Sequence, residues 1–455
     1  MALLSPVRPR ATQYEDDTTD QIDDTPSEIP DRTFEELGIA ADLVQVLNDG
    51  GITAPFPVQT LTIPDALEGR DVTGKAQTGS GKTLAFGLPM IERTTTAKPR
   101  RPHALVLEPT RELANQVAEE LAPLAAVRGL WLSAIYGGVS MPRQTQALRE
   151  GVDMVIATPG RLNDLLEREE ISLRDVSYVV VDEADQMADM GFLPQVERIL
   201  RQTRGTPQTL LFSATLDGMV ATLIDRYQHD PVHHKVVTNT ATVETLEQRF
   251  IRVTAGDKVL VAAKVCAGAE RALVFVRTTH GADRLAGQLK REGLKAVPIH
   301  GRLTQSKRER TLEQFADGSA PILVATNVAA RGLHIDDIDV VVHFDPPEDH
   351  KVYLHRSGRT ARAGKGGMVV TLVLPEQVRD VTRFEQRGDI DLQIVKMSAD
   401  DPRLLDLQSW DPPRMEKQPG GERGRRRGSS NFGQRAGRSR RRPGSVANRG
   451  GRGRR

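Results

Sequence analysis

The sequence predicts an α/β protein with two tandem, doubly wound domains, each with a mostly parallel sheet, flanked by disordered tails. Three observations lead to this prediction: short apolar runs alternate with helical segments, the alternation occurs in two blocks, and both ends of the chain are highly charged. Alternation of this kind is typical of parallel sheets that are covered by helices. At 455 residues, the chain is long enough for two or three domains.

The first block predicts a domain over residues 31–236. Its apolar runs are short and most of them end at polar residues, as expected for parallel strands that are buried on both faces. The predicted strands are Ala104–Leu107, Asp153–Ala157, Ser177–Val181 and Thr209–Phe212, and the predicted helices between them include Arg111–Leu124 and Gly160–Glu169.

The second block predicts a domain over residues 248–397, joined to the first by a Thr-rich linker at 237–247. Its strands and helices alternate in the same way. The predicted strands are Ala272–Val276, Ala296–His300, Pro321–Thr326 and Val340–Phe344, and the predicted helices lie near Gly281–Glu292 and Ser306–Phe315. Residues 398–455 are predicted to form an extension and an Arg/Gly-rich tail.

The two ends of the chain carry opposite charge, although the formal net charge is only +1. Residues 1–36 hold ten acidic and three basic residues, so residues 1–30 are predicted to be disordered. Residues 421–455 hold thirteen arginines and one acidic residue, Glu422. Such a tail is predicted to be a flexible polycation that binds the backbone of RNA or DNA, with a solubilising extension as the alternative.

Composition excludes several other classes of protein. No apolar run approaches the roughly 18 residues that would span a bilayer, and the first residues are too poor in apolar side chains for a secretory signal. Cys266 is the only cysteine, which excludes disulfides within the chain and cysteine-rich zinc sites. A cytoplasmic location is expected, with no membrane partner.

The stretch from Ala76 to Thr83 predicts a phosphate-binding loop. Its glycines allow backbone N–H groups to surround a phosphate, Lys82 is placed to reach the β- and γ-phosphates, and Thr83 is placed to bind Mg²⁺. The predicted ATP-binding residues here are Ala76, Gln77, Thr78, Gly79, Ser80, Gly81, Lys82 and Thr83. The usual pattern begins with Gly where this chain has Ala76, so a solvated lysine in a glycine-rich turn is the alternative for Lys82.

A second motif follows about a hundred residues later, where the apolar run Tyr178–Val181 ends in Asp182, Glu183 and Asp185. The carboxyl end of a buried parallel strand faces the ligand crevice. Asp182 is therefore predicted to bind the metal, and Glu183 to act as the base or to orient water. Together the two motifs indicate a chain that binds and hydrolyses a nucleoside triphosphate.

The second block has no phosphate loop, but it offers arginines in the segment 355–364. Arg359 and Arg362 are three residues apart, so they lie on one side of a helical turn. They are predicted to reach the γ-phosphate as arginine fingers. A solvated basic helix is the alternative.

These motifs and their order, over residues 31–395, resemble those of bacterial DEAD-box ATP-dependent RNA helicases of superfamily 2. The resemblance implies two RecA-like domains of the P-loop NTPase type. Phe34, followed 17 residues on by Gly51 and then by Gln59, resembles the adenine-recognition motif of this family. It implies that Gln59 binds the adenine edge and that Phe34 packs on the base. The coupling residues implied by the family are Asp185, Ser213, Thr215 and His355.

The same resemblance implies RNA contacts from both domains, largely to the sugar–phosphate path and therefore with little sequence specificity. The residues implied are Pro109, Thr110, Arg111, Gly138, Thr158, Gly160 and Arg161 in the first domain, and Thr278, Gly301, Gln305, Arg308 and Thr326 in the second. Ribosomal or RNA-decay proteins are further candidate partners.

Four positions depart from the family pattern. Phe56 stands where Thr is usual, Ala361 where Gly is usual, and Asn327 and His334 where Asp is usual. The missing carboxylate at His334 bears on the strength of ATP-driven closure. The activity implied is ATP-dependent unwinding of short RNA duplexes, coupled to RNA binding and release. An ATP-gated RNA clamp or chaperone, a DNA-directed superfamily 2 helicase and a small-molecule kinase are the alternatives.

Overall fold

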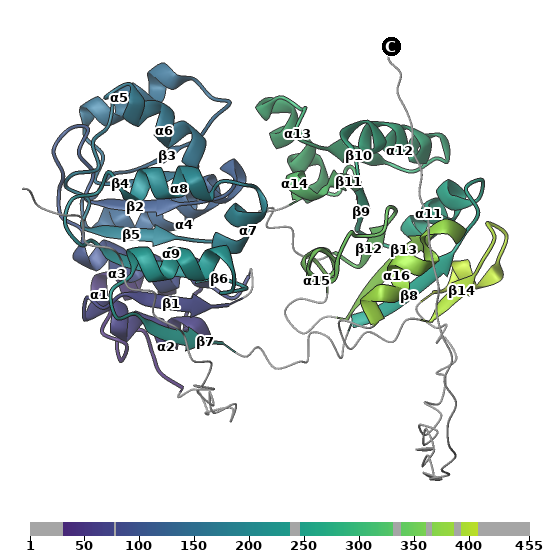
Figure 1. Ribbon diagram of the computed structural model, residues 1–455, viewed down its shortest axis with the longest axis horizontal. Helices are drawn as coiled ribbons and strands as arrows, with labels where there is room; N and C mark the ends of the chain where they lie inside the picture. Colours follow the sequence, from purple (N-terminus) through teal and green to yellow (C-terminus); the bar gives the residue numbers. More distant parts are fainter. Residues whose placement is uncertain are drawn as a thin grey trace, which may run out of the picture. The chain divides into compact units, whose positions relative to one another are not determined.

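The computed structural model describes residues 31–76, 79–236, 246–330, 338–360, 366–385 and 393–407. Both predicted domains are present, and each contains a sheet of seven strands with helices packed against it (Figure 1). Within the described residues, every strand pairing in the two sheets is parallel. The predicted fold class is therefore confirmed, whereas the predicted tails lie outside the described residues.

Domain one has the strand order β3-β4-β2-β5-β6-β1-β7. Its strands are β1 (Val72–Lys75), β2 (Ala104–Leu107), β3 (Leu132–Ile135), β4 (Met154–Ala157), β5 (Tyr178–Val181), β6 (Gln208–Ser213) and β7 (Val232–Lys235). Its helices are α1 (Ala41–Asp49), α2 (Pro57–Leu67), α3 (Lys82–Arg93), α4 (Arg111–Val127), α5 (Met141–Glu150), α6 (Pro159–Glu167), α7 (Ala184–Asp189), α8 (Leu193–Leu200) and α9 (Met219–Tyr227).

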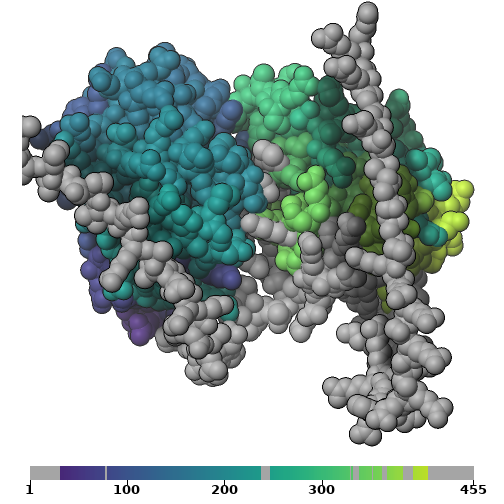
Figure 2. All heavy atoms as spheres, viewed as in Figure 1, coloured from purple at the N-terminus to yellow at the C-terminus, as the bar shows by residue number. Residues whose placement is uncertain are grey.

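The core of domain one consists of two layers because successive strand residues point to opposite faces of the sheet. Val106 and Val180 pack in one layer with α1 to α4. Leu107 and Val181, one residue further along each strand, pack in the other layer with α6, α8 and α9. Helices α8 and α9 lie in front of this sheet in Figure 1, and teal atoms form the corresponding front surface of domain one in the space-filling view (Figure 2). The strands are hydrophobic throughout because both faces are buried.

Domain two has the strand order β10-β11-β9-β12-β13-β8-β14, which is the order of domain one with seven added to each strand number. Its strands are β8 (Leu246–Arg252), β9 (Ala272–Val276), β10 (Ala296–Ile299), β11 (Ile322–Thr326), β12 (Val340–His343), β13 (Gly367–Val373) and β14 (Ile394–Lys396). Its helices are α11 (Lys258–Ala267), α12 (Thr279–Arg291), α13 (Gln305–Ala316), α14 (Asn327–Ala330), α15 (His350–Ser357) and α16 (Val378–Glu385), with short 3₁₀ helices η1 (Pro375–Gln377) and η2 (Pro402–Leu405). The two blocks of the sequence therefore share one topology.

The limits of domain two differ from the predicted ones at both ends. Strand β8 begins at Leu246, two residues before the predicted start of the domain. Leu404 and Leu407 are buried in the same core cluster as α11 and α12, so the packed part of the domain continues beyond Met397. An isolated 3₁₀ turn has too few residues for an apolar period, so its burial leaves no signal in the sequence.

Two expectations drawn from composition can be compared with the described residues. No helix in this part of the chain has the length and apolar character needed to cross a membrane. Cys266 lies in α11, is buried, and forms no disulfide, and burial raises the pKa of its thiol to about 12.

Candidate nucleotide site and RNA-contacting edges

The predicted phosphate loop joins β1 to α3. Gly79 and Gly81 have φ angles of 84° and 86°, in the left-handed region that favours glycine. A β-carbon on Gly81 would lie only 2.7 Å from the side-chain nitrogen of Gln59 and from the ring of Phe56. Helix α3 begins at Lys82, so its first N–H groups lie directly after the glycines, as a phosphate requires. Gln77 and Thr78 lie outside the described residues.

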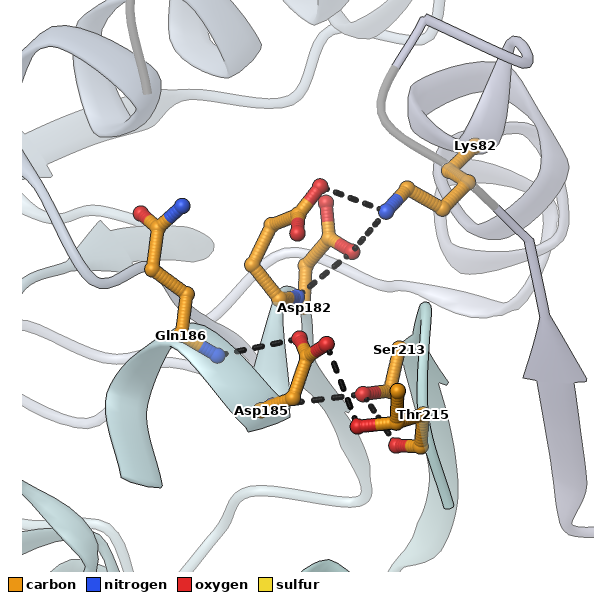
Figure 3. A network of polar contacts seen from close by, with 7 residues as sticks. Lys82, Asp182, Asp185, Gln186, Ser213 and Thr215 are labelled. Atoms are coloured by element: carbon orange, nitrogen blue, oxygen red, sulfur yellow. Dashed lines mark hydrogen bonds and ion pairs between the residues drawn. The ribbon is translucent and has the colours of Figure 1, made fainter. Parts of the chain in front are cut away.

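Lys82 places its ammonium group against two carboxylates (Figure 3). Its Nζ atom lies 2.6 Å from Oε1 of Glu183 and 3.5 Å from Oδ1 of Asp182, and all three side chains are buried. Burial by itself would lower the pKa of Lys82, but the two carboxylates more than offset this effect and hold the pKa above its usual value. Lys82 is therefore a fixed cation at the start of α3, and not a solvated lysine.

Asp182 and Glu183 follow β5, at the carboxyl edge of the sheet. Glu183 has φ 48° and ψ 47°, a left-handed conformation that strains a residue with a β-carbon and that is concentrated at functional sites. Its N–H group donates to Oδ1 of Asp182 over 2.8 Å. Burial raises the pKa of Asp182 to about 6, an effect that Lys82 opposes and Glu183 reinforces.

Asp185 connects the end of β5 to the end of β6 (Figure 3). Its N–H group donates to Oγ of Ser213 over 3.2 Å, and its Oδ2 atom accepts from Oγ1 of Thr215 over 3.4 Å. The Ser213 hydroxyl in turn donates to the carbonyl oxygen of Thr215 over 2.6 Å. The structure thus brings together three of the predicted coupling residues. The fourth, His355, lies on α15 of domain two.

The two predicted adenine-binding residues have different surroundings. The side chain of Gln59 is buried beside the phosphate loop, where Nε2 donates to the carbonyl oxygen of Gly81 over 2.8 Å and Oε1 accepts from the N–H of Phe56 over 2.8 Å. Phe34 is only 1% exposed and belongs to the core of domain one. Phe56 is instead 54% exposed, and it is an aromatic side chain beside the loop for which the sequence predicts no binding role.

The predicted RNA-contacting residues of domain one all lie at the carboxyl ends of three neighbouring strands, β3, β4 and β2. Pro109 to Arg111 follow β2, Gly138 follows β3, and Thr158 to Arg161 follow β4. The guanidinium group of Arg111 lies so close to Gly138 that a β-carbon there would collide with it. The nucleotide motifs follow β1, β5 and β6, so the two sets occupy two halves of one sheet edge.

Several of these residues also hold their own helices in place. The hydroxyl of Thr110 accepts the N–H of Leu113 over 3.3 Å and so caps α4. Arg161 donates from Nη1 to Oε1 of Gln144 over 2.6 Å, which connects α6 to α5. Structural roles of this kind are compatible with phosphate contacts, because both use polar groups at helix starts.

Domain two repeats this arrangement. Thr278 follows β9 and caps α12, its hydroxyl accepting the N–H of Gly281 over 3.0 Å. Gly301 follows β10, Gln305 and Arg308 lie on α13, and Thr326 ends β11. The strands β10, β11 and β9 are neighbours in the order that β3, β4 and β2 have in domain one. The structure therefore places both predicted RNA-contacting sets at equivalent edges of two equivalent sheets.

The predicted arginine fingers are only partly described. Arg359 follows α15, whereas Arg362, Ala361 and His334 lie outside the described residues. The neighbouring Arg356 is buried: its Nε donates to Oδ1 of Asn327 over 2.7 Å, and its guanidinium lies 5.0 Å from the centre of the Phe275 ring. Asn327, one of the departures from the family pattern, thus connects α14 to α15.

Comparisons with known proteins agree with this geometry. The DEAD/DEAH box helicase model matches residues 56–223, and the helicase conserved C-terminal domain model matches residues 258–364. DEAD-box ATP-dependent RNA helicase CshA of Bacillus subtilis is 41% identical over 356 residues, which cover 78% of this chain and 72% of that protein. The chain belongs to the DEAD-box ATP-dependent RNA helicases. CshA of Geobacillus kaustophilus is 40% identical over 356 residues, 78% of this chain and 76% of that protein.

Two solved structures show the same fold. Dbp5 of Saccharomyces cerevisiae bound to RNA and ADP BeF₃ aligns with a TM-score of 0.71 and 28% identity, covering 81% of this chain and 96% of that one. Mss116p bound to single-stranded RNA and AMP-PNP aligns with a TM-score of 0.72 and 28% identity, covering 81% of this chain and 80% of that one. The two tandem RecA-like domains implied by the sequence resemblance are therefore confirmed.

The oxygen donors of this DEAD-box protein fit a magnesium ion. Asp182 offers a carboxylate beside the start of α3, and Mg²⁺ typically takes one or two protein carboxylates together with water and substrate phosphates. The hydroxyl of Thr83 contacts the carboxyl group of Glu120, whose pKa is raised by burial and lowered in part by this hydrogen bond. Thr83 as a metal ligand stays a prediction.

One buried acidic residue near the motifs was not selected from the sequence. Glu108 directly follows β2, and its side chain is fully buried. Burial raises its pKa well above the usual value, Asp182 and Glu183 raise it further, and Lys82 opposes them. In the sequence, the feature that could have identified Glu108 as a site residue is its position directly before the motif that begins at Pro109. Only the pairing of β2 with β5 shows that it lies near Asp182.

Proposed function

We propose that the chain uses ATP hydrolysis to bind and release RNA and thereby opens short duplexes locally. The observation that carries this proposal is a pair of contact sets on one short segment: Lys82 pairs with Asp182 and Glu183, and two residues further on Asp185 is hydrogen-bonded to Ser213 and Thr215. Together these contacts extend from the phosphate loop across the ends of β5 and β6, so a change at the γ-phosphate can alter the geometry of these strand ends.

In the proposed reaction, the residues of domain one hold and orient ATP. The N–H groups at the start of α3 and Lys82 bind the phosphates, and Gln59 lies beside the loop, where adenine is to be recognised. Asp182 would hold Mg²⁺, which supplies positive charge to the β- and γ-phosphate oxygens when it is bound. Glu183 then orients the attacking water, for which Lys82 must leave Glu183 and move to the phosphates.

Domain two supplies Arg359 and Arg362 to the γ-phosphate in this proposal, and the equivalent sheet edges of both domains bind one RNA strand. A closed state with ATP and single-stranded RNA bound is favoured because both ligands bind it better than the open state. Duplex RNA fits the closed state poorly, so closure separates the strands, and hydrolysis releases the RNA. In this proposal, polar groups at strand ends and helix starts bind the phosphate backbone of the RNA. Recognition is therefore largely independent of the RNA sequence.

The partner that we propose is thus RNA, bound by the core and by the basic tail, with ribosomal or RNA-decay proteins as further partners in a cytoplasmic setting. An RNA clamp that hydrolyses ATP only to release RNA would use the same residues. The two activities differ in one property, which is whether a duplex is opened.

Strand displacement from a short RNA duplex distinguishes these activities. We expect the full chain to release the labelled strand when ATP and Mg²⁺ are present. Glu183→Gln should bind ATP and RNA but give little multiple-turnover release, because the carboxylate that orients water is absent. ATP-dependent RNA binding without strand release would identify a clamp, and hydrolysis by Glu183→Gln at the wild-type rate would refute the role given to Glu183.

A further inference from the structure

Glu108 lies on the strand next to Asp182. Strands β2 and β5 are parallel neighbours in which Leu107 pairs with Val181. The pairing continues for one more residue, since the N–H of Asp182 donates to the carbonyl oxygen of Leu107 over 3.1 Å. On the other side of β2, the N–H of Glu108 donates to the carbonyl oxygen of Ala157, the last residue of β4, over 2.9 Å. Glu108 and Asp182 are therefore adjacent across the two strands.

The side chains of these two residues point to the same side of the sheet. Two residues earlier in each strand, Val106 and Val180 pack in the core layer that contains α3. Because side chains alternate along a strand, Glu108 and Asp182 point toward that same side, where α3 begins at Lys82. Electrostatic interactions of Glu108 with Asp182, Glu183 and Lys82 agree with this placement.

The described contacts reveal no role for the carboxyl group of Glu108 in stabilising the fold. The residue is 0% exposed, and among the described residues neither of its carboxyl oxygens has a hydrogen-bond partner. The ammonium group of Lys82 lies instead against Glu183 and Asp182. Nearly all buried polar atoms in native proteins have a partner, so these two oxygens need one that the described residues do not supply, such as bound water or a group of a ligand.

The ligand expected here brings suitable donors. Mg²⁺ loses its water reluctantly and usually keeps several bound water molecules, even when a carboxylate and phosphates bind it directly. These waters are strong donors, and carboxylates around a metal site commonly orient the groups that bind it. Glu108 lies one strand away from the predicted metal ligand Asp182, which is the correct position for such an outer carboxylate.

We propose that Glu108 is a further residue of the magnesium–nucleotide site, a positioning carboxylate that accepts hydrogen bonds from water bound to the metal. This inference rests on the proposed use of Mg²⁺ and ATP. Glu108 also lies at the boundary of the two halves of the sheet edge, since β5 carries the nucleotide motif and β2 leads into the predicted RNA contacts at Pro109 to Arg111.

The test compares the full wild-type chain with Glu108→Gln and Glu108→Leu, using a fluorescent ATP analogue with Mg²⁺ or with EDTA. Glu150→Gln, at an exposed position at the end of α5, is the matched control. Both Glu108 variants should weaken binding with Mg²⁺ by about 10- to 100-fold and leave binding in EDTA unchanged, whereas the control should match the wild type. Equal Mg²⁺-dependent affinity in the wild type and both variants would overturn the inference.

Thermal unfolding of the nucleotide-free chains separates positioning from a purely structural role. Glu108→Leu removes buried polar atoms without partners, so its midpoint should be equal to or higher than that of the wild type. A clearly lower midpoint in both variants would show that Glu108 stabilises the fold, and would also overturn the inference. If the wild-type chain itself fails to bind ATP with Mg²⁺, the proposed function fails instead.

Discussion

Lys82 shows how a single residue connects stability with chemistry. Its ammonium group lies between the buried carboxylates of Glu183 and Asp182. Burial raises the pKa of Asp182 to about 6, and the positive charge of Lys82 opposes this effect. The same arrangement places the ammonium group at the start of α3, where phosphates are predicted to bind.

Replacing this lysine should therefore reduce stability as well as activity. Lys82→Ala leaves two buried carboxylates uncompensated, and breaking a buried ion pair from one side typically destabilises a protein by about 3–5 kcal/mol. We expect ATP hydrolysis to be abolished and the free energy of unfolding of domain one, measured in urea, to fall by an amount of this order. Lys98→Ala, at an exposed position of the same domain, is the control and should change neither quantity. An unchanged urea midpoint for Lys82→Ala would contradict the structural part of this expectation.

At the scale of elements, a buried histidine lies between two strands of domain two. His343 ends β12, its Nδ1 atom lies 3.0 Å from Oγ1 of Thr371 on β13, and its ring packs edge-on against Tyr353 of α15. Burial, reinforced by the charge of Arg356, lowers the pKa of His343 well below its usual value. The imidazole of His343 is therefore neutral when it is packed between β12, β13 and α15.

This lowered pKa predicts a pH dependence of stability. In the unfolded chain, His343 takes up a proton near its usual pKa of about 6.5, whereas in the folded chain it stays neutral to lower pH. Its contribution to stability is thus complete above pH of about 6.5 and is lost as the pH falls below that value, by about 1.4 kcal/mol per pH unit. Chemical denaturation between neutral and mildly acidic pH measures this loss. His343→Gln should show a smaller decrease, and an identical pH profile for both chains would refute the assignment.

At the scale of the whole molecule, the chain consists of two domains of one topology and of terminal segments with a very different composition. Because the two domains share one topology, polar residues follow the strands at the equivalent edge of each sheet. The phosphate-loop sequence is found in domain one and not in domain two. The two domains are therefore predicted to have different roles. Domain one binds the nucleotide, and domain two contributes arginines and RNA contacts without a phosphate loop of its own.

The basic tail should contribute affinity for RNA rather than catalysis. Deleting residues 415–455 removes thirteen arginines, and on single strands each neutralised phosphate contributes a slope of about −0.7 in log affinity against log salt. We expect weaker RNA binding, most of all at low salt, and a salt dependence that is flatter by several units. The ATPase rate at saturating RNA should change little, because the predicted catalytic residues lie upstream. Equal salt slopes would leave the tail as a solubilising extension, and a collapsed saturated rate would place it in the active core.

The sequence by itself determined the local features of this protein. Apolar runs such as Ala104–Leu107 and Ala272–Val276 have the same bounds in the structure as in the prediction, because strands buried on both faces leave an uninterrupted hydrophobic signal. The phosphate loop and the acidic motif were equally readable, since their chemistry depends on residues that are close in the chain. The order of these motifs predicted membership of the DEAD-box RNA helicases, and the family models and relatives confirm it.

Only the tertiary structure decided which side chains meet. The contact of Lys82 with Glu183 joins residues 101 positions apart, and the bond from Gln59 to Gly81 fixes a side chain that the sequence assigned to adenine alone. Phe34 is in the core, although its predicted partner was the base. Glu108 became visible as a site residue only through the pairing of β2 with β5. Strand order and register depend on packing between distant segments, and no local pattern of residues contains that information.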